Sequence, residues 1–519
     1  MVFDAGSRAL KCAIANEENR IIVTESIFPK LIKSADGFGR KWESTGYWEN
    51  LLNLAELTIK KAKINSQEIR YITSTAIRPS CLFCDIDFNP LYIGASFDLQ
   101  GIDYGDEIEE KFVELTGESL YQKTGHFPNF YMVPARYEWL RNNPESINNK
   151  KIAHYLPIDS WILVRFGGEF HTNYTSAMES GFYDLKEKNW LKEWYSILEI
   201  DDAFLPPTVM SGEIIGNVDN SIQERLGLSP DTELVAGLPD TQAALFAANS
   251  ISPGNISIVL GTTTPVQAVV ENLFIDPGEH CWIGGISIKN ICDNYIVEAS
   301  TGITGQLIKW AANLFDSELE KQITEPSKEQ YENIRKRYHN FDDTEITASE
   351  EEVKTSAVYA NLGPLPLATT STERLGGEFY FPSPGGVDES YISQNQLIGA
   401  IFDNIMFAVS KNVEYLEQLL GFEQFSLTVL GGISRFTLLS QRISDLFNKA
   451  TNYLQNPEAS IQGNLILCDI ASGKIKNMQD FEKEISHNGD LCKVEPRDSM
   501  TNKLQMKYKE WLRIIDFNT

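Results

Sequence analysis

Residues 234–264 constrain the fold more than any other part of the sequence. An apolar run ends in a glycine turn that carries Asp240, and a helix of small residues follows. After a short spacer, a second apolar run ends in the hydroxyl-rich turn Gly261-Thr262-Thr263. Backbone N–H groups and hydroxyls in such a turn can cup an anion. The stretch therefore predicts a carboxylate and a phosphate-sized anion hole on neighbouring turns.

The length of the chain predicts more than one folded domain. Its 519 residues exceed the roughly 100–200 residues of a usual domain. The 42% hydrophobic and 11% aromatic residues are sufficient for two cores. The composition shifts to Pro, Gly and Ser over residues 206–218, which is typical of a crossing segment. We therefore expect two domains, residues 1–235 and residues 236–519.

The chain is strongly acidic. Asp and Glu outnumber Lys and Arg by 72 to 45, which gives a formal net charge of −27. Such a charge repels nucleic acid and anionic lipid, so we expect neither as a partner. An anionic ligand would need a local exception made from backbone N–H groups, a few Lys or Arg side chains, or a bound divalent cation. For a nucleotide ligand, this bias indicates Mg²⁺.

The seven cysteines do not form the dense, even-numbered framework of a small secreted protein. Only Cys81 and Cys84 lie close together, and without a second pair we interpret them as buried structural thiols, not as a redox or zinc site. The six histidines never fall at metal-ligand spacing. No charged-then-apolar leader opens the sequence, and no uninterrupted apolar stretch reaches about 18 residues. We therefore expect a soluble, cytoplasmic protein.

The first fifteen residues predict two strands around a tight turn. Gly6 lets the backbone bend, Ser7 supplies a hydroxyl and an N–H group, and Asp4 ends the first strand. Such a turn can hold a phosphate, while the carboxylate can bind Mg²⁺ through water. Lys11 either adds positive charge there or lies on the strand surface. An ordinary hairpin is the alternative to a phosphate site.

A further polar turn lies between two strands expected within residues 68–85. It places Arg78 among small residues, where the fixed fork of guanidinium donors can grip substrate hydroxyls. The alternative is an ordinary surface arginine.

The C-terminal part contains a glycine turn after a strand. A long helix expected over residues 397–420 leads to a strand at 425–430 and then to Gly431 and Gly432. Two glycines allow a flat ligand to lie against the backbone, and the helix that begins after Ser434 aims N–H groups at it.

Residues 314–355 are rich in Glu, Asp and Lys. Such a stretch is typical of solvated helices and linkers. The alternative is that this stretch forms an interface with another protein molecule. The sequence does not decide whether the protein forms a homodimer.

Taken together and in order, these turns resemble the FGGY family of carbohydrate kinases, which belongs to the actin-like ATPase superfamily. The resemblance spans nearly the whole chain and is greatest to kinases of the xylulose, glycerol and autoinducer-2 types. An ordered set of matches is far more specific than any one of them. The matching segments are residues 4–11, 131–140, 211–213, 237–244, 261–263, 431–434 and 458–463.

The resemblance implies an α/β fold with two ribonuclease H-like domains around an interdomain cleft that closes on ATP and substrate. It implies that Asp240 is the general base, that Asp4 is the carboxylate on the metal side, and that ATP and Mg²⁺ are required. A sugar or polyol hydroxyl is a poor nucleophile, and a carboxylate within reach can take its proton as the P–O bond forms. The residues implied to bind ATP are Gly6, Ser7, Lys11, Gly261, Thr262, Thr263, Gly431, Gly432 and Ser434.

Departures from the family pattern concern mainly the substrate side. The turn at Arg78 is similar to that of glycerol and autoinducer-2 kinases, not to the Gln-Met-His-Gly turn of many ketopentose kinases. Gln100 stands where a substrate-side arginine is usual, and Ile433 replaces a glycine of the adenosine loop. Arg78 and Asp98, together with Asp240, are therefore the expected substrate contacts.

The leading hypothesis is an ATP-dependent kinase that phosphorylates a hydroxyl of a small sugar, ketose or polyol. A non-catalytic sugar or nucleotide sensor on the same fold is the alternative, motivated by Gln100 and Ile433. An actin-like or chaperone-like ATPase would share the phosphate turns but would not need the segment around Ser211. The presence of both Asp4 and Asp240 favours the kinase.

Overall fold

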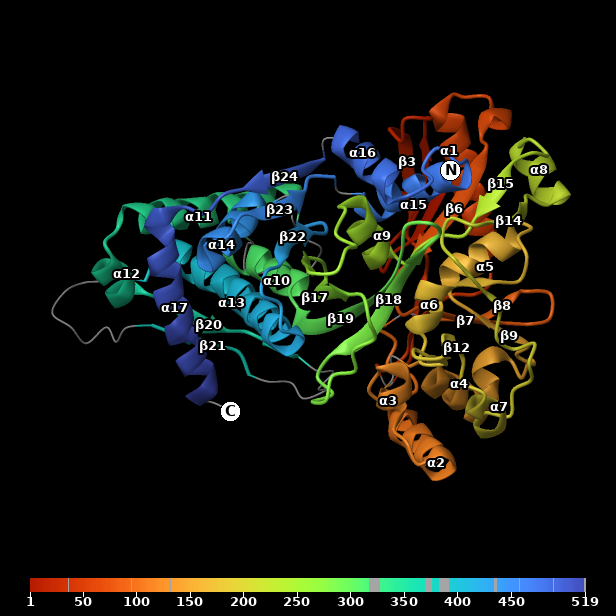
Figure 1. Cartoon of the computed structure of the whole chain (residues 1–519), viewed down its shortest axis with the longest axis horizontal. Coiled ribbons are helices and arrows are strands. Elements are labelled where there is room, and N and C mark those ends of the chain that lie inside the picture. Colours follow the sequence, from red (N-terminus) through yellow and green to blue (C-terminus); the bar gives the residue numbers. More distant parts are fainter. Residues whose placement is uncertain are drawn as a thin grey trace. The chain divides into compact units, whose positions relative to one another are not determined.

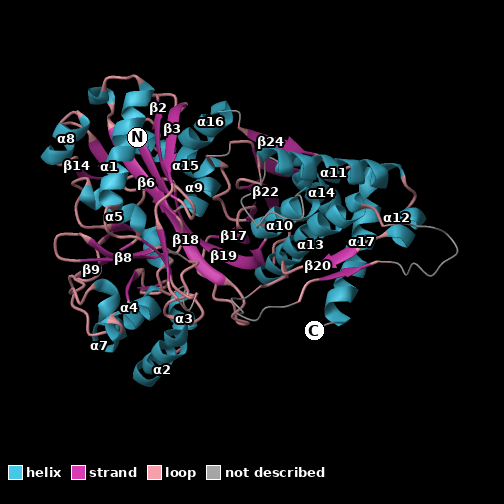
Figure 2. Cartoon of the chain, turned by 180° about the vertical axis from the view of Figure 1, so that it is seen from behind, coloured by secondary structure: helices cyan, strands magenta, loops and turns pink. Residues whose placement is uncertain are grey.

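A computed structural model of the chain contains two compact units, each built from several segments (Figures 1 and 2). The first unit contains residues 1–253, 269–297 and 458–487, and the second contains residues 254–268, 298–457 and 488–519. The predicted sequence boundary after Val235 stays a prediction. The structure describes residues 1–35, 37–94, 96–129, 132–316, 327–368, 376–381, 392–433, 436–456, 458–488 and 490–517.

Strands and helices succeed one another along most of the chain, as Figure 2 shows in two colours. The strands are β1 (Val2–Ala5), β2 (Leu10–Ala15), β3 (Ile21–Ile27), β4 (Leu31–Lys33), β5 (Arg40–Trp42), β6 (Tyr71–Ala76), β7 (Cys81–Cys84), β8 (Pro90–Gly94), β9 (His154–Leu156), β10 (Thr172–Asn173), β11 (Tyr183–Asp184), β12 (Asn189–Trp190), β13 (Thr208–Val209), β14 (Ile214–Asn217), β15 (Glu233–Val235), β16 (Asn255–Val259), β17 (Thr263–Val270), β18 (Trp282–Ile288), β19 (Cys292–Ile303), β20 (Tyr359–Asn361), β21 (Glu378–Tyr380), β22 (Ser426–Leu430), β23 (Thr451–Leu454) and β24 (Leu491–Val494). The α-helices are α1 (Tyr47–Ala62), α2 (Gly105–Thr116), α3 (Leu120–Thr124), α4 (Val133–Asn142), α5 (Ile158–Arg165), α6 (Tyr174–Met178), α7 (Glu193–Ile197), α8 (Asn220–Leu226), α9 (Asp240–Ala247), α10 (Gly305–Asp316), α11 (Lys328–Thr347), α12 (Glu350–Ser356), α13 (Gln394–Leu420), α14 (Thr437–Phe447), α15 (Ala459–Ala471), α16 (Met478–Asn488) and α17 (Asp498–Phe517).

The main sheet of the first unit has the strand order β14-β15-β6-β1-β2-β3. β1 pairs in parallel with β6 and antiparallel with β2, which confirms the two strands predicted at the start of the chain. Successive side chains of a strand point to opposite faces. Phe3 accordingly packs in a core with residues of α1 and α5, whereas Val2 packs with Ile461 and Leu465 of α15. Helices therefore cover both faces of β1, and its carboxyl end is buried.

The chain leaves this sheet through the turn that follows β6. β6 ends at Ala76, and β7 begins at Cys81 in a second sheet of order β4-β5-β8-β7-β9. The two predicted strands are present, but they belong to different sheets. The turn that carries Arg78 is therefore a crossing between sheets and not a hairpin.

Helices α9 and α15 of the first unit pack with almost no space between their backbones. A Cβ atom at Gly463 of α15 would lie only 2.0 Å from the carbonyl oxygen of Ala243 in α9. No side chain fits at that distance, so glycine is required there. The absence of a side chain lets α15 lie directly against α9.

The turn before α9 is equally crowded. A Cβ atom at Gly237 would lie 1.8 Å from the carbonyl oxygen of Ser74 in β6. The Asn464 side chain of α15 accepts a hydrogen bond from the N–H group of Leu238 at 3.0 Å. Strand β6 and helix α15 therefore fix the turn on two sides, and Asp240 follows this turn as the first residue of α9.

In the second unit, strands β17, β16, β22, β23 and β24 pair in this order. β16 and β22 are parallel, with Val259 beside Leu430, so the carboxyl ends of the two strands meet at one edge of the sheet. The long helix and the strand predicted over residues 397–430 are present as α13 and β22.

Buried ion pairs join the helices of the second unit. The side chain of Arg442 in α14 has no exposed surface and contacts three carboxylates at 2.8–2.9 Å, those of Asp342, Glu345 and Asp403. Lys507 of α17 contacts Glu345 and Asp403 at 2.6 Å each. This mutual pairing offsets the cost of removing the charges from water. The ion pairs therefore link α11, α13, α14 and α17.

These contacts correct the interpretation of residues 314–355 as solvated helices and linkers. Residues 317–326 lie outside the described residues, but α11 buries Ile334, Tyr338 and Phe341. Two of its acidic side chains also belong to the buried ion pairs. Their cationic partners come from helices about 100 and 160 residues further along the chain, which a local charge pattern cannot reveal.

In the part of the chain that the structure describes, none of the helices combines the length and the apolar character that a membrane span needs. The seven cysteines are free thiols. Cys81 and Cys84 are buried, as predicted, and burial raises the pKa of the Cys84 thiol to about 12. A thiol with so high a pKa is unreactive at neutral pH.

Replacing Gly463 by Ala should destabilise the first unit. The added Cβ atom would overlap a backbone oxygen of α9, so the helices must move apart, and we expect the free energy of unfolding to fall by about 1–3 kcal/mol. Gly376→Ala is the matched control, because a Cβ atom there meets no other atom within 4 Å. Urea unfolding followed by circular dichroism compares the two variants. Equal transition midpoints would contradict the close packing of α9 and α15.

Candidate functional site

Asp4 lies close to the carboxyl end of β1 in the first unit. The residue is 6% exposed, and its Oδ2 accepts a hydrogen bond from the Ser460 hydroxyl at 3.3 Å. Lys11 Nζ lies 3.9 Å from this oxygen and 2.5 Å from Glu458 Oε2. Burial raises the pKa of Asp4 to about 7, although the charge of Lys11 lowers it. The charges of Asp240 and Glu458 also raise this pKa. A carboxylate in this environment favours a nearby cation.

The turn between β1 and β2 contains the predicted phosphate residues Gly6 and Ser7. The Gly6 N–H group donates to the carbonyl oxygen of Ala9 at 3.1 Å and closes the turn. Ser7 is only partly buried. Gly6 and Ser7 thus lie in the turn directly after β1 and Asp4, and their role in binding phosphate stays a prediction.

Asp240 begins α9 directly after the crowded Gly237 turn. Its Oδ1 accepts a hydrogen bond from the Thr241 N–H group at 2.7 Å. Burial raises the pKa of Asp240, while the charge of Arg78 lowers it and the charge of Glu179 raises it. A carboxyl group whose pKa is moved toward neutrality is suited to act as a general base.

Glu179 is the centre of a buried polar cluster beside Asp240. Its Oε2 accepts hydrogen bonds from Arg78 Nη1 at 3.1 Å and from Trp282 Nε1 at 2.8 Å. Its Oε1 accepts one from Gln242 Nε2 at 2.7 Å. A Cβ atom at Gly284 would lie 2.4 Å from this Oε1, so glycine in β18 leaves the space that the carboxylate occupies. The predicted Arg78 is therefore not a surface arginine but part of a buried ion pair.

Sequence reasoning missed Glu179, Gln242 and Trp282. Glu179 lies 63 residues from Gln242 and 103 from Trp282 in the sequence, so no local pattern connects them. The position of Gln242 two residues after Asp240 and the glycine pair that follows Trp282 are the signals that were present.

The predicted segment at Ser211 supports the turn of Asp240. The Ser211 hydroxyl donates to the carbonyl oxygen of Gly237 at 2.7 Å, and the Gly212 N–H group donates to that of Ala236 at 2.8 Å. This segment therefore helps to hold the turn before Asp240 in place.

The second unit brings its two predicted turns together. Gly261 follows β16 and Gly431 follows β22, the parallel strands that end side by side. A Cβ atom at Gly431 would lie 2.4 Å from the carbonyl oxygen of Leu260, and the φ angle of Gly431 is 92°. The N–H group of Thr304, just before α10, donates to the carbonyl oxygen of Thr262 at 3.1 Å. The first turn is thus held between β22 and the start of α10.

The side chains of Thr262 and Thr263 are exposed, and a Cβ atom at Gly432 would meet no atom within 4 Å. Both features leave space for a ligand. Ser434 lies outside the described residues. The assignment of these residues to nucleotide binding stays a prediction.

Asp98, a predicted substrate contact, lies in a different polar cluster. Its carboxylate accepts hydrogen bonds from the Tyr92 hydroxyl at 2.6 Å and from the N–H groups of Arg40 and Gln100 at 3.0 and 3.2 Å. None of these hydrogen bonds reaches Arg78 or Asp240. Its part in substrate binding stays a prediction.

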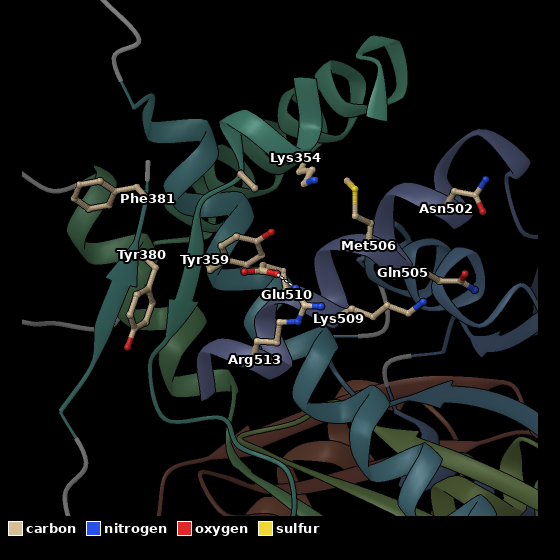
Figure 3. A pocket seen from close by; sticks show the side chains of 11 residues that line it. Lys354, Tyr359, Tyr380, Phe381, Asn502, Gln505, Met506, Lys509, Glu510 and Arg513 are labelled. Carbon is tan, nitrogen blue, oxygen red and sulfur yellow. Dashed lines mark hydrogen bonds and ion pairs between the residues drawn. The ribbon is translucent and has the colours of Figure 1, made fainter. Parts of the chain in front are cut away.

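A hollow of about 670 Å³ lies elsewhere in the second unit (Figure 3). Side chains of α12, β20, β21 and α17 line it. Glu510 and Arg513 form an ion pair of 3.0 Å, and Figure 3 shows both side chains. None of the predicted site residues is among those that line it. Volume alone therefore does not identify the functional site.

Comparisons with known proteins agree with the resemblance. Residues 1–247 match the N-terminal domain of the FGGY family of carbohydrate kinases. The putative sugar kinase YoaC of Bacillus subtilis (strain 168) is 25% identical over 98% of this chain and 95% of its own. The autoinducer-2 kinase of Escherichia coli (strain K12) is 20% identical over 99% of this chain and 95% of its own. The structure of Plasmodium falciparum glycerol kinase with ADP is similar with a TM-score of 0.79 at 18% identity, over 99% of this chain and 97% of that one.

The structural likeness confirms the predicted fold class, an α/β protein with two ribonuclease H-like domains. The matched residues 1–247 include Asp4, Arg78 and Asp240. Both curated relatives cover nearly the whole chain, so the likeness extends beyond the matched domain. Residues 1–247 are thus similar to the N-terminal domain of the FGGY family of carbohydrate kinases, and the whole chain is similar to the two curated kinases.

Proposed function

We propose that this protein is a carbohydrate kinase that transfers the terminal phosphoryl group of ATP to a hydroxyl of a small sugar, ketose or polyol, with Asp240 as the general base. One observation carries the proposal: burial raises the pKa of Asp240 at the start of α9, while the charge of Arg78 keeps that rise in check. A carboxylate of this kind can accept the hydroxyl proton as the P–O bond forms.

ATP is the proposed phosphoryl donor. The turns at Gly261 and Gly431 supply N–H groups and hydroxyls at the ends of two adjacent strands, a common arrangement for holding phosphates. The glycerol kinase with ADP, a relative in fold, is consistent with this nucleotide.

Mg²⁺ is the proposed metal, and Asp4 is the carboxylate proposed to bind it. Among the described residues, no three His, Cys, Asp or Glu side chains come together as a metal cage. Magnesium held by a nucleotide needs only one or two protein carboxylates, since phosphates and water complete its shell. The buried Asp4, whose pKa is raised partly by Asp240 and Glu458, fits that demand. The ion would neutralise charge on the phosphates.

The acceptor is proposed to be small and hydroxylated. The relatives are named for a sugar, for autoinducer-2 and for glycerol, which points to a small molecule with several oxygen atoms. Arg78 would position it beside Asp240, because the two side chains interact electrostatically. Much of the rate enhancement would come from this positioning, as in other phosphoryl transfers.

Replacing Asp240 by Asn should lower kcat by about 10²–10⁴-fold, because the amide cannot accept the hydroxyl proton. A coupled assay of ADP release with glycerol, xylitol, D-xylulose and other sugars measures the change. Nucleotide binding, measured by calorimetry, should remain. Asp219→Asn is the matched control, since Asp219 caps α8 and an Asn can cap equally well. Unchanged turnover in Asp240→Asn would remove the proposed base.

Replacing Arg78 by Gln should move the acidic limb of the kcat/KM profile to higher pH. The Arg78 charge lowers the pKa of Asp240, so its loss leaves burial less opposed and raises that pKa. The ionised base then appears only at higher pH. Arg225→Gln, which removes an arginine paired with Glu49 and Glu56, is the control and should leave the limb in place. An unshifted limb in Arg78→Gln would contradict Asp240 as the titrating base.

A further inference from the structure

Glu179 brings a second carboxylate to the proposed acceptor site. It is 2% exposed and binds Arg78, Trp282 and Gln242 through three hydrogen bonds. Its charge also acts on Asp240. Two carboxylates thus face one guanidinium, and that guanidinium is already committed to Glu179. The local charge does not favour a third anion.

His126 adds no positive charge to this cluster. Its ring stacks on that of Trp282 with centroids 3.7 Å apart, and its Nε2 donates to the carbonyl oxygen of Ile283 at 2.9 Å. Burial lowers the pKa of His126 to about 3, so the ring is neutral at physiological pH. The stacked ring holds the indole of Trp282 in place against Glu179.

The Gln242 side chain has a hydrogen-bond acceptor that is not paired with a hydrogen-bond donor among the described residues. The residue has no exposed surface, and its Nε2 is taken up by Glu179 at 2.7 Å. Its Oε1 is buried and has no hydrogen-bond partner among the described residues. A buried amide oxygen without a donor is costly, so a ligand hydroxyl that reaches it would be favoured. A carboxylate or phosphate oxygen, which carries no proton, cannot donate to it.

We propose that Glu179 and Gln242 are specificity-determining residues that select a neutral acceptor with a second hydroxyl beside the one phosphorylated, and that exclude sugar acids and sugar phosphates. Gln242 Oε1 accepts a hydrogen bond from the second hydroxyl. Glu179 holds Arg78, Trp282 and the Gln242 amide in position and repels an anionic acceptor. This selection rests on the proposed function, since it needs the acceptor to lie beside Asp240.

The test compares neutral acceptors with their acids on the full-length protein. The probes are glycerol against glycerate and D-xylose against D-xylonate, each measured by ADP release and by the ligand-induced shift in melting temperature. The wild-type protein should favour the neutral member of a pair at least tenfold in kcat/KM or in binding. Preference for the acid would overturn the proposal, even where turnover depends on Asp240.

Glu179→Gln keeps the size and the hydrogen-bonding reach of the side chain but removes its charge. It should narrow the preference for the neutral member by about tenfold or more, because the repulsion of the acid is lost. Glu138→Gln, a buried glutamate paired with Lys111 and Arg141 outside the site, is the matched control and should leave the preference unchanged. A folded Glu179→Gln protein with the wild-type preference would overturn the role of Glu179.

Gln242→Met removes the hydrogen-bond acceptor Oε1 and keeps the side-chain volume nearly constant. It should weaken the binding of a vicinal diol about tenfold, but not that of the matching deoxy compound, which lacks the second hydroxyl. Equal losses for both compounds would overturn the role of Gln242. If none of the probes is phosphorylated, the shifts in melting temperature decide whether neutral acceptors are preferred. The absence of any Asp240-dependent turnover would contradict the proposed function but not the proposed selectivity.

Discussion

The close packing of α15 on α9 is the contact on which the site of the first unit depends. Gly463 allows the two backbones to touch, and Asn464, the next residue, holds the N–H group of Leu238. Ser460 of the same helix reaches Asp4. One helix therefore sets the positions of both Asp4 and the turn that leads to Asp240, although the two carboxylates are 236 residues apart in the sequence.

This arrangement concentrates negative charge in a buried place. Asp240 and Glu458 act electrostatically on Asp4, and Glu179 acts on Asp240, while Lys11 opposes the charge at Asp4 and Arg78 that at Asp240. Burial, and after it the neighbouring carboxylates, raises the pKa values of Asp4 and Asp240, which suits a proton-accepting group or a cation site. The same charges suit the proposed metal ion and the proposed neutral acceptor, and they would repel an anionic acceptor. Binding and selection therefore follow from one electrostatic environment.

Much of the fold and the positions of the candidate site turns could be predicted from the sequence because these turns are local. Asp240, Gly261 and Gly431 each follow an apolar strand, and the polar or glycine residues of a turn mark that position. The parallel pairing of β16 with β22 then brings two of these turns together. For Arg78, the sequence predicted the turn that carries the residue but not the ion pair that its buried side chain forms.

The rest depends on contacts between distant segments. Glu179 stands in a polar stretch with no pattern of its own, and only the fold brings it to Arg78 and Trp282. The burial of α11 was missed for the same reason, because the partners of its acids lie in later helices. Charge that appears to belong to a solvated surface is neutralised by residues that no window of sequence contains.

A crystal structure with a bound neutral acceptor and a non-hydrolysable ATP analogue tests the central claim most directly. The account predicts one acceptor hydroxyl within about 2.6–3.2 Å of the Asp240 carboxylate, with a second hydroxyl donating to Gln242 Oε1. An acceptor bound away from Asp240, with another group placed to take its proton, would contradict the account.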